Sequence, residues 1–234
     1  MKKIMFVSVL LFIVTAFVFS NDVFFPTKVG TTQLTANLNS HGRVEGYSLM
    51  KVKDVKGADN DMTIVYTIQV LDRNRKPADK TGEREYSVKI TDGVVEFELK
   101  NTMDAFFAAK NMNYSISGNK LLIPSNMTAG SKINNSWMKM IIKVPVVGEV
   151  VADVAITDIT CTGIEAVTVP AGTFEAYKIT QTSTTVTTGW IAPKIVNKGT
   201  TWYAKGIGMV KSVNYDEKGK LESSSELHEL VSSR

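Results

Sequence analysis

Apolar and polar residues alternate with a period of two along most of this chain, and turn-forming residues interrupt the alternation at short intervals. One of the clearest stretches sets Met138, Met140 and Ile142 against Lys139 and Lys143. Because successive side chains of a strand point to opposite faces of a sheet, this pattern predicts a strand with one apolar face. A chain dominated by such strands has to form a sheet that buries one of its sides.

The alternation predicts about ten to twelve strands. No helices alternate with them, which excludes a parallel sheet built from strand–helix–strand units. Many short strands at regular spacing are typical of a sandwich or a barrel of mainly antiparallel strands. The best-defined strands are expected at residues 32–38, 44–55, 62–71, 84–91, 94–100, 137–144, 148–157, 159–169, 174–186, 209–215 and 221–231.

Turn signals between these strands predict hairpins. Asp92-Gly93 is the strongest, because both central residues of a type I′ turn need positive φ. Ser117-Gly118-Asn119 predicts a second hairpin in the same way.

One helix is expected between these two hairpins, from Thr102 to Lys110. Thr102 suits the N-cap and Asp104 suits the first turn. Phe106 and Phe107 are adjacent, so at about 100° per residue they cannot both face the sheet. We expect one ring to dock on the sheet and the other to meet solvent, a ligand or a loop.

The N-terminus has the layout of a bacterial secretory signal peptide. Lys2 and Lys3 precede an apolar run over residues 4–19, and cleavage is expected after Ser20. The run is shorter than the roughly 20 apolar residues of a membrane span. We expect residues 21–234 to form a single β-rich domain, periplasmic or secreted, with no transmembrane anchor after cleavage.

Charge and cysteine usage exclude further classes of protein. Loss of Lys2 and Lys3 with the signal peptide reduces the 27 basic residues to 25, against 23 acidic ones. The mature chain is thus almost neutral and has no basic cluster, so no nucleic-acid partner is expected. Cys161 is the one cysteine, so no intramolecular disulfide can form, and we expect it to be a small buried strand residue.

The sequence contains no HExxH, CxxC, Walker or GxSxG motif, and its two histidines, His41 and His228, are far apart. Ser223-Ser224-Ser225 are interpreted as outward-facing polar positions of a strand. We therefore expect no metal, no cofactor and no enzymatic activity.

Aromatic and methionine side chains remain as candidates for a ligand pocket, although each could instead fill the core. The candidates for a lid or for ligand-facing positions are Phe106, Phe107, Met138, Met140, Trp190 and Trp202.

Two segments carry a resemblance to a known family: VPAGTFEAYKI at residues 169–179 and WYAKGIGMVK at residues 202–211. They resemble the TapB-like family of exported bacterial proteins of unknown function, and the likeness begins at Phe24-Phe25-Pro26. Such proteins look like the LolA/LolB lipoprotein carriers, whose fold is a strongly curved open antiparallel sheet, or half-barrel, with a short helical lid. The resemblance implies a concave face lined by alternate strand residues, and it transfers no catalytic residue. A two-sheet sandwich, which would have no such cavity, is the alternative fold.

Two hypotheses about function follow. The first is a non-enzymatic binding protein of the cell envelope that holds a lipid, an acyl chain or another amphiphilic ligand in its concave face. The second is an envelope protein that joins a protein partner through an exposed sheet edge or through its Phe24-Phe25 arm.

Overall fold

The structure is a computed structural model that describes residues 22–78, 82–109, 112–144, 148–188 and 194–232. The predicted signal peptide, Lys110 and Trp190 lie outside these ranges. No helix in the described part of the chain is long and apolar enough to cross a membrane. The elements are β1 (Thr32–Asn39), β2 (Val44–Ala58), β3 (Asp61–Asp72), β4 (Arg84–Thr91), β5 (Val94–Glu98), α1 (Leu99–Ala109), β6 (Asn113–Gly118), β7 (Lys120–Pro124), β8 (Ser136–Val144), β9 (Gly148–Val169), β10 (Gly172–Thr188), β11 (Ile195–Ala204), β12 (Gly208–Asp216) and β13 (Leu221–Val231).

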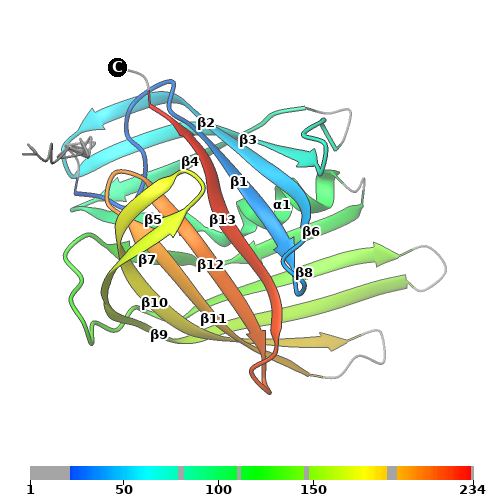
Figure 1. Cartoon of the computed structure of the whole chain (residues 1–234). Helices are drawn as coiled ribbons and strands as arrows, with labels where there is room; N and C mark the ends of the chain where they lie inside the picture. Colours follow the sequence, from blue (N-terminus) through cyan, green and yellow to red (C-terminus); the bar gives the residue numbers. More distant parts are fainter. Residues whose placement is uncertain (1–21, 79–81, 110–111, 145–147, 189–193, 233–234) are drawn as a thin grey trace, which may run out of the picture.

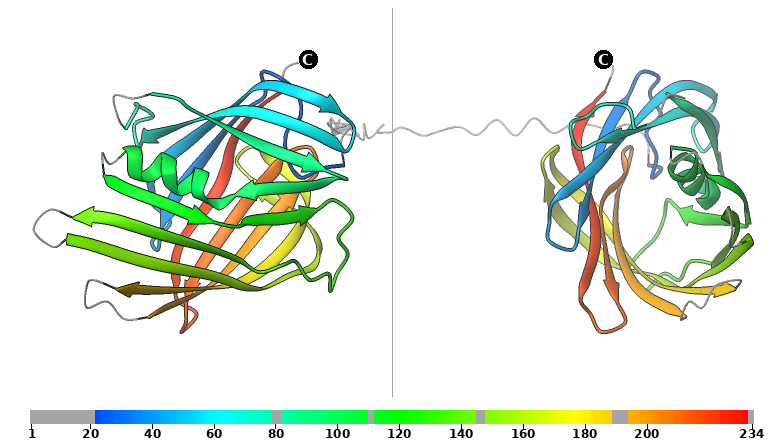
Figure 2. Two further views of the ribbon diagram at one scale, coloured as in Figure 1. Left: turned by 180° about the vertical axis from the view of Figure 1, so that it is seen from behind. Right: turned by 90° about the vertical axis from the view of Figure 1, so that its right-hand side faces the viewer.

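All thirteen strands belong to one sheet, in the order β6-β8-β9-β10-β11-β12-β13-β1-β2-β3-β4-β5-β7. Every pairing is antiparallel, and the sheet curves into a nearly closed, barrel-like ring with one seam (Figures 1 and 2). The prediction of an all-β, strongly curved antiparallel sheet with one short helix is therefore confirmed. The sandwich alternative is not the fold that the chain adopts.

The two edge strands of this sheet, β6 and β7, are consecutive in the chain, and Asn119 alone separates them. β6 pairs with β8, whereas β7 pairs with β5, so one extended segment passes from one side of the seam to the other. The predicted hairpin at Ser117-Gly118-Asn119 is therefore wrong. Gly118 lies so close to β8 that a Cβ there would be 2.6 Å from the Trp137 carbonyl oxygen, and the Asn119 amide donates to that oxygen at 3.2 Å.

Two other boundaries differ from the prediction. The helix begins at Leu99, directly after β5, so Thr102 lies inside the helix and is not its N-cap. Residues 148–169 form one strand and not two, because Asp158 adopts a φ of 55° and the pairing with β10 shifts register there without ending. Such a bulge bends a strand while keeping it in the sheet.

The largest buried cluster lies inside the curve of the sheet, at the end where the N-terminal arm (residues 22–25) enters. Seven strands contribute to it: β2, β3, β4, β5, β7, β9 and β10. Phe24 is fully buried, and its ring meets that of Tyr177 edge-on at 4.9 Å. Phe25 meets Tyr66 at 5.3 Å, and the Gly206 amide donates to the Val23 carbonyl at 2.7 Å.

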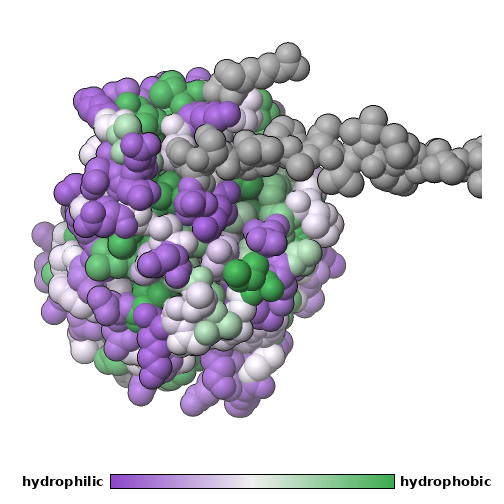
Figure 3. Space-filling view, turned by 90° about the vertical axis from the view of Figure 1, so that its left-hand side faces the viewer, coloured by the Kyte–Doolittle hydropathy of each residue, from purple (hydrophilic) through white to green (hydrophobic). Residues whose placement is uncertain are grey.

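Figure 3 looks onto this end of the molecule, where apolar residues are scattered among polar ones outside the part that grey atoms cover. Because Val23, Phe24 and Phe25 are all buried, the arm fills the interior at this end of the ring.

A second buried cluster lies on the outer face. The hairpin between β9 and β10 folds back over β12 and β13 (Figure 2, right), where the Ala171 amide donates to the Leu227 carbonyl at 3.2 Å. Val167, Ala176 and Val210 are buried between these layers, and Trp202 packs against them. This hairpin covers apolar surface that the outer face of the sheet would otherwise expose.

Phe24→Ala tests whether the arm is part of the folded core. Because the side chain is fully buried among aromatic rings, we expect the free energy of unfolding to fall by about 3–5 kcal/mol in urea titrations. Val29→Ala is the control, since Val29 is 51% exposed and its truncation should change stability by less than about 0.5 kcal/mol. Similar small losses for both variants would show that the arm contributes little.

Candidate functional site

The pairing of β10 with β11 determines which residues face the interior. Tyr177, Ile179 and Tyr203 belong to the inner cluster, whereas Trp202 packs on the opposite face. The register of the two strands is regular over its whole length, so the inner face continues through Gln181 toward the other end of the ring.

The burial of β10 changes beyond Ile179, at the end away from the arm. Ile179 is buried, but every residue from Thr180 to Thr185 is half-buried, whichever face it points to. A filled interior would bury alternate residues of such a strand. The inner face of β10 is therefore less fully covered beyond Ile179 than beside the arm, and we call this part of the ring its open end.

The inner face of the open end carries a polar strip across six neighbouring strands, from β10 to β2. Its side chains contact one another: Asn214 Nδ2 donates to Ser223 Oγ at 3.3 Å, and Ser225 Oγ donates to Asn37 Oδ1 at 3.0 Å. The strip consists of amide and hydroxyl side chains around one glycine: Asn37, Ser48, Gln181, Asn197, Gly199, Thr201, Ser212, Asn214, Ser223 and Ser225.

Ser223 and Ser225 were predicted to face outward, and this prediction is wrong. Successive side chains of a strand alternate between its faces, so the three serines cannot all point outward, and the hydrogen bonds of Ser223 and Ser225 join them to the inner face.

The neighbouring strands β6, β8 and β9 give the open end an apolar wall. Met140 pairs with Ile116 on one side and with Ala152 on the other. Met138 is buried and pairs with Val154, which packs against the inner cluster. The wall consists of Ile116, Met138, Met140, Ile142, Val150, Ala152 and Val154. Together the wall and the strip line what we call the chamber, apolar on one side and polar on the other.

Helix α1 lies inside the curve of the sheet beside β6 (Figure 2, right) and is fixed there by three side chains, which we call the seam latch. Tyr86 from β4 donates to one oxygen of the Asp104 carboxylate at 2.8 Å, and Tyr114 from β6 donates to the other at 2.7 Å. The helical carboxylate thus links two strands on opposite sides of the seam.

Burial and the hydrogen bond to Asp104 raise the pKa of Tyr114 to about 12, and the same two causes raise the pKa of Tyr86. Both phenols therefore stay protonated and keep donating at neutral pH.

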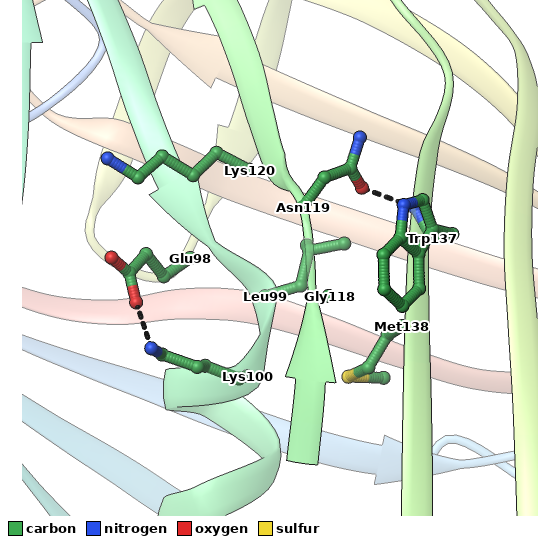
Figure 4. Close-up of a pocket in the computed structure, with 8 residues that line it drawn as sticks. All are labelled: Glu98, Leu99, Lys100, Gly118, Asn119, Lys120, Trp137 and Met138. Carbon is green, nitrogen blue, oxygen red and sulfur yellow. Dashed lines mark hydrogen bonds and ion pairs between the residues drawn. The ribbon is translucent and has the colours of Figure 1, made fainter.

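A small cavity of about 120 Å³ lies farther along the seam (Figure 4). There Asn119 Oδ1 accepts the backbone N–H of Trp137 at 2.6 Å, and Lys100 pairs with Glu98 at 2.7 Å. The Trp137 side chain is half-exposed at its rim. The cavity is lined by Glu98, Leu99, Lys100, Gly118, Asn119, Lys120, Trp137 and Met138.

The lysines at this cavity already have carboxylate partners. Lys120 pairs with Glu96 at 2.6 Å, and that hydrogen bond lowers the pKa of Glu96 and raises the pKa of Lys120. A ligand in this cavity would have to compete with existing ion pairs, so the chamber is the stronger candidate site.

The structure brings some of the predicted candidate residues together and not others. Met138 and Met140 share the apolar wall, and Phe107 of α1 is buried with its ring 5.3 Å from that of Tyr114. Phe106 also belongs to α1. Trp202 lies on the outer face, where its Nε1 donates to Glu165 at 2.7 Å, so it does not join the chamber.

Cys161 is fully buried in β9, which confirms its prediction as a core residue. Within the described ranges, no three His, Cys, Asp or Glu residues form a group that could hold a metal ion.

Sequence reasoning missed the seam latch and the polar strip. Asp104 was assigned only to the start of a helix, and nothing in the sequence links it to tyrosines 18 and 10 residues away. The runs of Asn, Ser and Thr in the second half of the chain were a usable signal for the strip, but their facing depends on bulges.

The protein therefore has a barrel-like fold, and its N-terminal arm closes one end of the interior. By sequence, the chain belongs to the DUF3108-like family, which matches residues 28–227. The family has no known function. No protein of curated function matches the chain.

Two solved structures share the fold. A candidate exported protein with a YmcC-like fold from Bacteroides fragilis superposes with a TM-score of 0.73 at 21% identity, covering 89% of this chain and 99% of that one. A candidate lipoprotein from Parabacteroides distasonis gives a TM-score of 0.74 at 21% identity, covering 89% and 98%. At this identity the likeness establishes the fold alone, and the TapB-like assignment stays a prediction.

Tyr114→Phe and Tyr86→Phe test the seam latch. Each removes a hydroxyl that donates to a carboxylate, and we expect each to lower local stability at the seam by about 1 kcal/mol. Hydrogen exchange should accelerate in α1 and β6 and stay unchanged in β12. Tyr215→Phe, on β12, is the matched control. Equal acceleration throughout the sheet would contradict a local latch.

Alkaline pH should destabilise the protein through its tyrosines. Burial raises the pKa of Tyr203 to about 12, whereas an unfolded tyrosine titrates near about 10. The unfolded chain therefore loses its proton first, and the stabilisation, complete below about pH 10, is lost as the pH rises toward about 12. Urea titrations between about pH 10 and 12 give the slope of the free energy of unfolding against pH. Tyr203→Phe should make this slope shallower by about 1.4 kcal/mol per pH unit. An unchanged slope would contradict the assignment.

Proposed function

We propose that this protein is an exported, non-catalytic binding protein of the bacterial envelope that holds an amphiphilic ligand, with an acyl chain, in the chamber. The proposal is supported by the two-sided lining of the chamber. Met140 and its neighbours on the apolar wall continue around the ring into Asn214 and its neighbours on the polar strip.

The physical basis is the transfer of apolar surface out of water. Each methylene group buried against the apolar wall is worth about 0.8 kcal/mol, so a chain of eight or more carbons would supply several kcal/mol. Methionine suits such a wall, because its flexible thioether adapts to chains of different shape. The arm ends the chamber at Phe24, which is fully buried, so a ligand would enter from the open end.

Helix α1 is the proposed lid over this chamber. It lies against β6 through the contact of Phe107 with Tyr114, and the seam latch is its attachment. Export, with cleavage after Ser20, and the carrier role of LolA/LolB-like proteins belong to the same proposal. They are supported by the signal-peptide layout of the N-terminus and by the curved-sheet fold.

The second hypothesis, a partner bound through a sheet edge or the arm, has less support. Phe24 and Phe25 are buried inside the ring, and β6 is flanked by α1. A partner strand would have to displace these contacts before it could pair.

Lipid extraction from the full-length protein, purified from its native envelope, followed by mass spectrometry, tests the proposal. We expect a bound amphiphile at about one copy per chain, because apolar burial favours retention of an acyl chain. Met140→Lys should abolish binding by placing a charge on the apolar wall.

Ile141→Lys is the matched control, because Ile141 is equally half-buried but points to the other face of β8. Ligand-free protein, or equal losses in the two variants, would overturn the assignment of the chamber.

A further inference from the structure

The chemistry of the polar strip defines which headgroup the chamber accepts. We infer that the ligand carries an uncharged, polyhydroxylated headgroup of the sugar class, held by the polar strip while its chain lies on the apolar wall. This inference rests on the proposed function and specifies its ligand.

The strip offers donors and acceptors together in a small area. An amide side chain carries two N–H donors and a carbonyl acceptor, and a hydroxyl can do either. Asn37 uses both ends at once, since its Oδ1 accepts from Ser225 at 3.0 Å and its Nδ2 donates to Ser48 at 3.4 Å. Each hydroxyl of a sugar also donates and accepts hydrogen bonds, so the mixed donors and acceptors of the polar strip can pair with it.

The charges around the strip disfavour an anionic headgroup. Glu222 accepts from Asn197 Nδ2 at 2.7 Å, and Asp216 lies opposite Asn197 in the neighbouring strand. Lys211, the residue before Ser212 in β12, points to the outer face, where its Nζ lies 5.7 Å from the centre of the Trp202 ring. A phosphate on the strip would therefore meet carboxylates nearby, while this lysine lies on the other side of the sheet.

The strip also has hydrogen-bonding capacity that the protein itself leaves unused. Asn197 Oδ1 is buried and accepts no hydrogen bond from the described residues. A ligand hydroxyl that reached Asn197 Oδ1 after a small rearrangement would supply the missing donor.

Gly199 lies close to two of the strip's amide side chains. A Cβ there would lie 3.2 Å from Gln181 Cγ and 3.3 Å from Asn214 Oδ1, so a larger residue would press on both amide side chains. Glycine at this position thus keeps the side chains of Gln181 and Asn214 free of that crowding in the middle of the strip.

Native mass spectrometry with three probes of equal chain length tests the inference: dodecyl maltoside, dodecyl phosphate and dodecanol. We expect the full-length protein to bind the maltoside about tenfold more tightly than either of the others. Ser225→Ala and Asn214→Leu should remove that advantage of the maltoside over dodecanol. Ser224→Ala is the matched control, because Ser224 points to the opposite face of β13 from Ser225.

The outcomes separate this inference from the proposed function. Equal binding of maltoside and dodecanol, or tighter binding of the phosphate, would overturn the sugar-class headgroup and leave the acyl-binding chamber standing. Binding of none of the three would overturn both. Loss of the maltoside preference in Ser224→Ala as well would overturn the polar strip as its site. Urea titration establishes whether each variant is folded. If Asn214→Leu does not fold, Ser225→Ala, which removes a single hydroxyl, still tests the inference.

Discussion

Closure of the sheet depends on one short segment that pairs with both of its edges. Residues 113–124 hydrogen-bond to β8 in their first half and to β5 in their second half, and Asn119 sits at the switch. Its side chain takes the place of a strand partner by accepting from Ser136 Oγ at 2.9 Å and from the Trp137 amide at 2.6 Å. Because the ring closes here, alternate side chains of every strand point toward a common interior.

The two ends of that inside differ because different segments complete them. The arm brings Phe24 and Phe25 into the ring, where aromatic contacts and a backbone hydrogen bond fix them. At the other end the inward side chains of six strands are amides and hydroxyls, which pack against one another and stay half-exposed. A ligand with an apolar and a polar part matches this difference better than a purely apolar one.

Local pattern predicted the strands well, because each depends on its own alternation and turns. The bounds of Arg84–Thr91 and Leu221–Val231 agree with the structure, and Asp92 and Gly93 both have the positive φ that their turn requires. The seam could not be predicted from local turn residues. Gly118 lies against the backbone of Trp137, a residue of another strand, and the local sequence does not reveal that contact. The prediction for Ser223 and Ser225 failed because the alternation of three consecutive serines does not say which of them face inward.

The composition of the inner face agrees with the lower burial of the open end. An amide or hydroxyl buried without a partner costs at least about 1 kcal/mol, so a strip of them facing a filled apolar core would be expensive. The strip meets part of that need internally, through pairs such as Asn214 with Ser223, but Asn197 Oδ1 stays without a donor. Contact with water satisfies such half-buried groups, so the polar strip suits the less covered end of the ring, whereas Phe24 is fully buried at the other end.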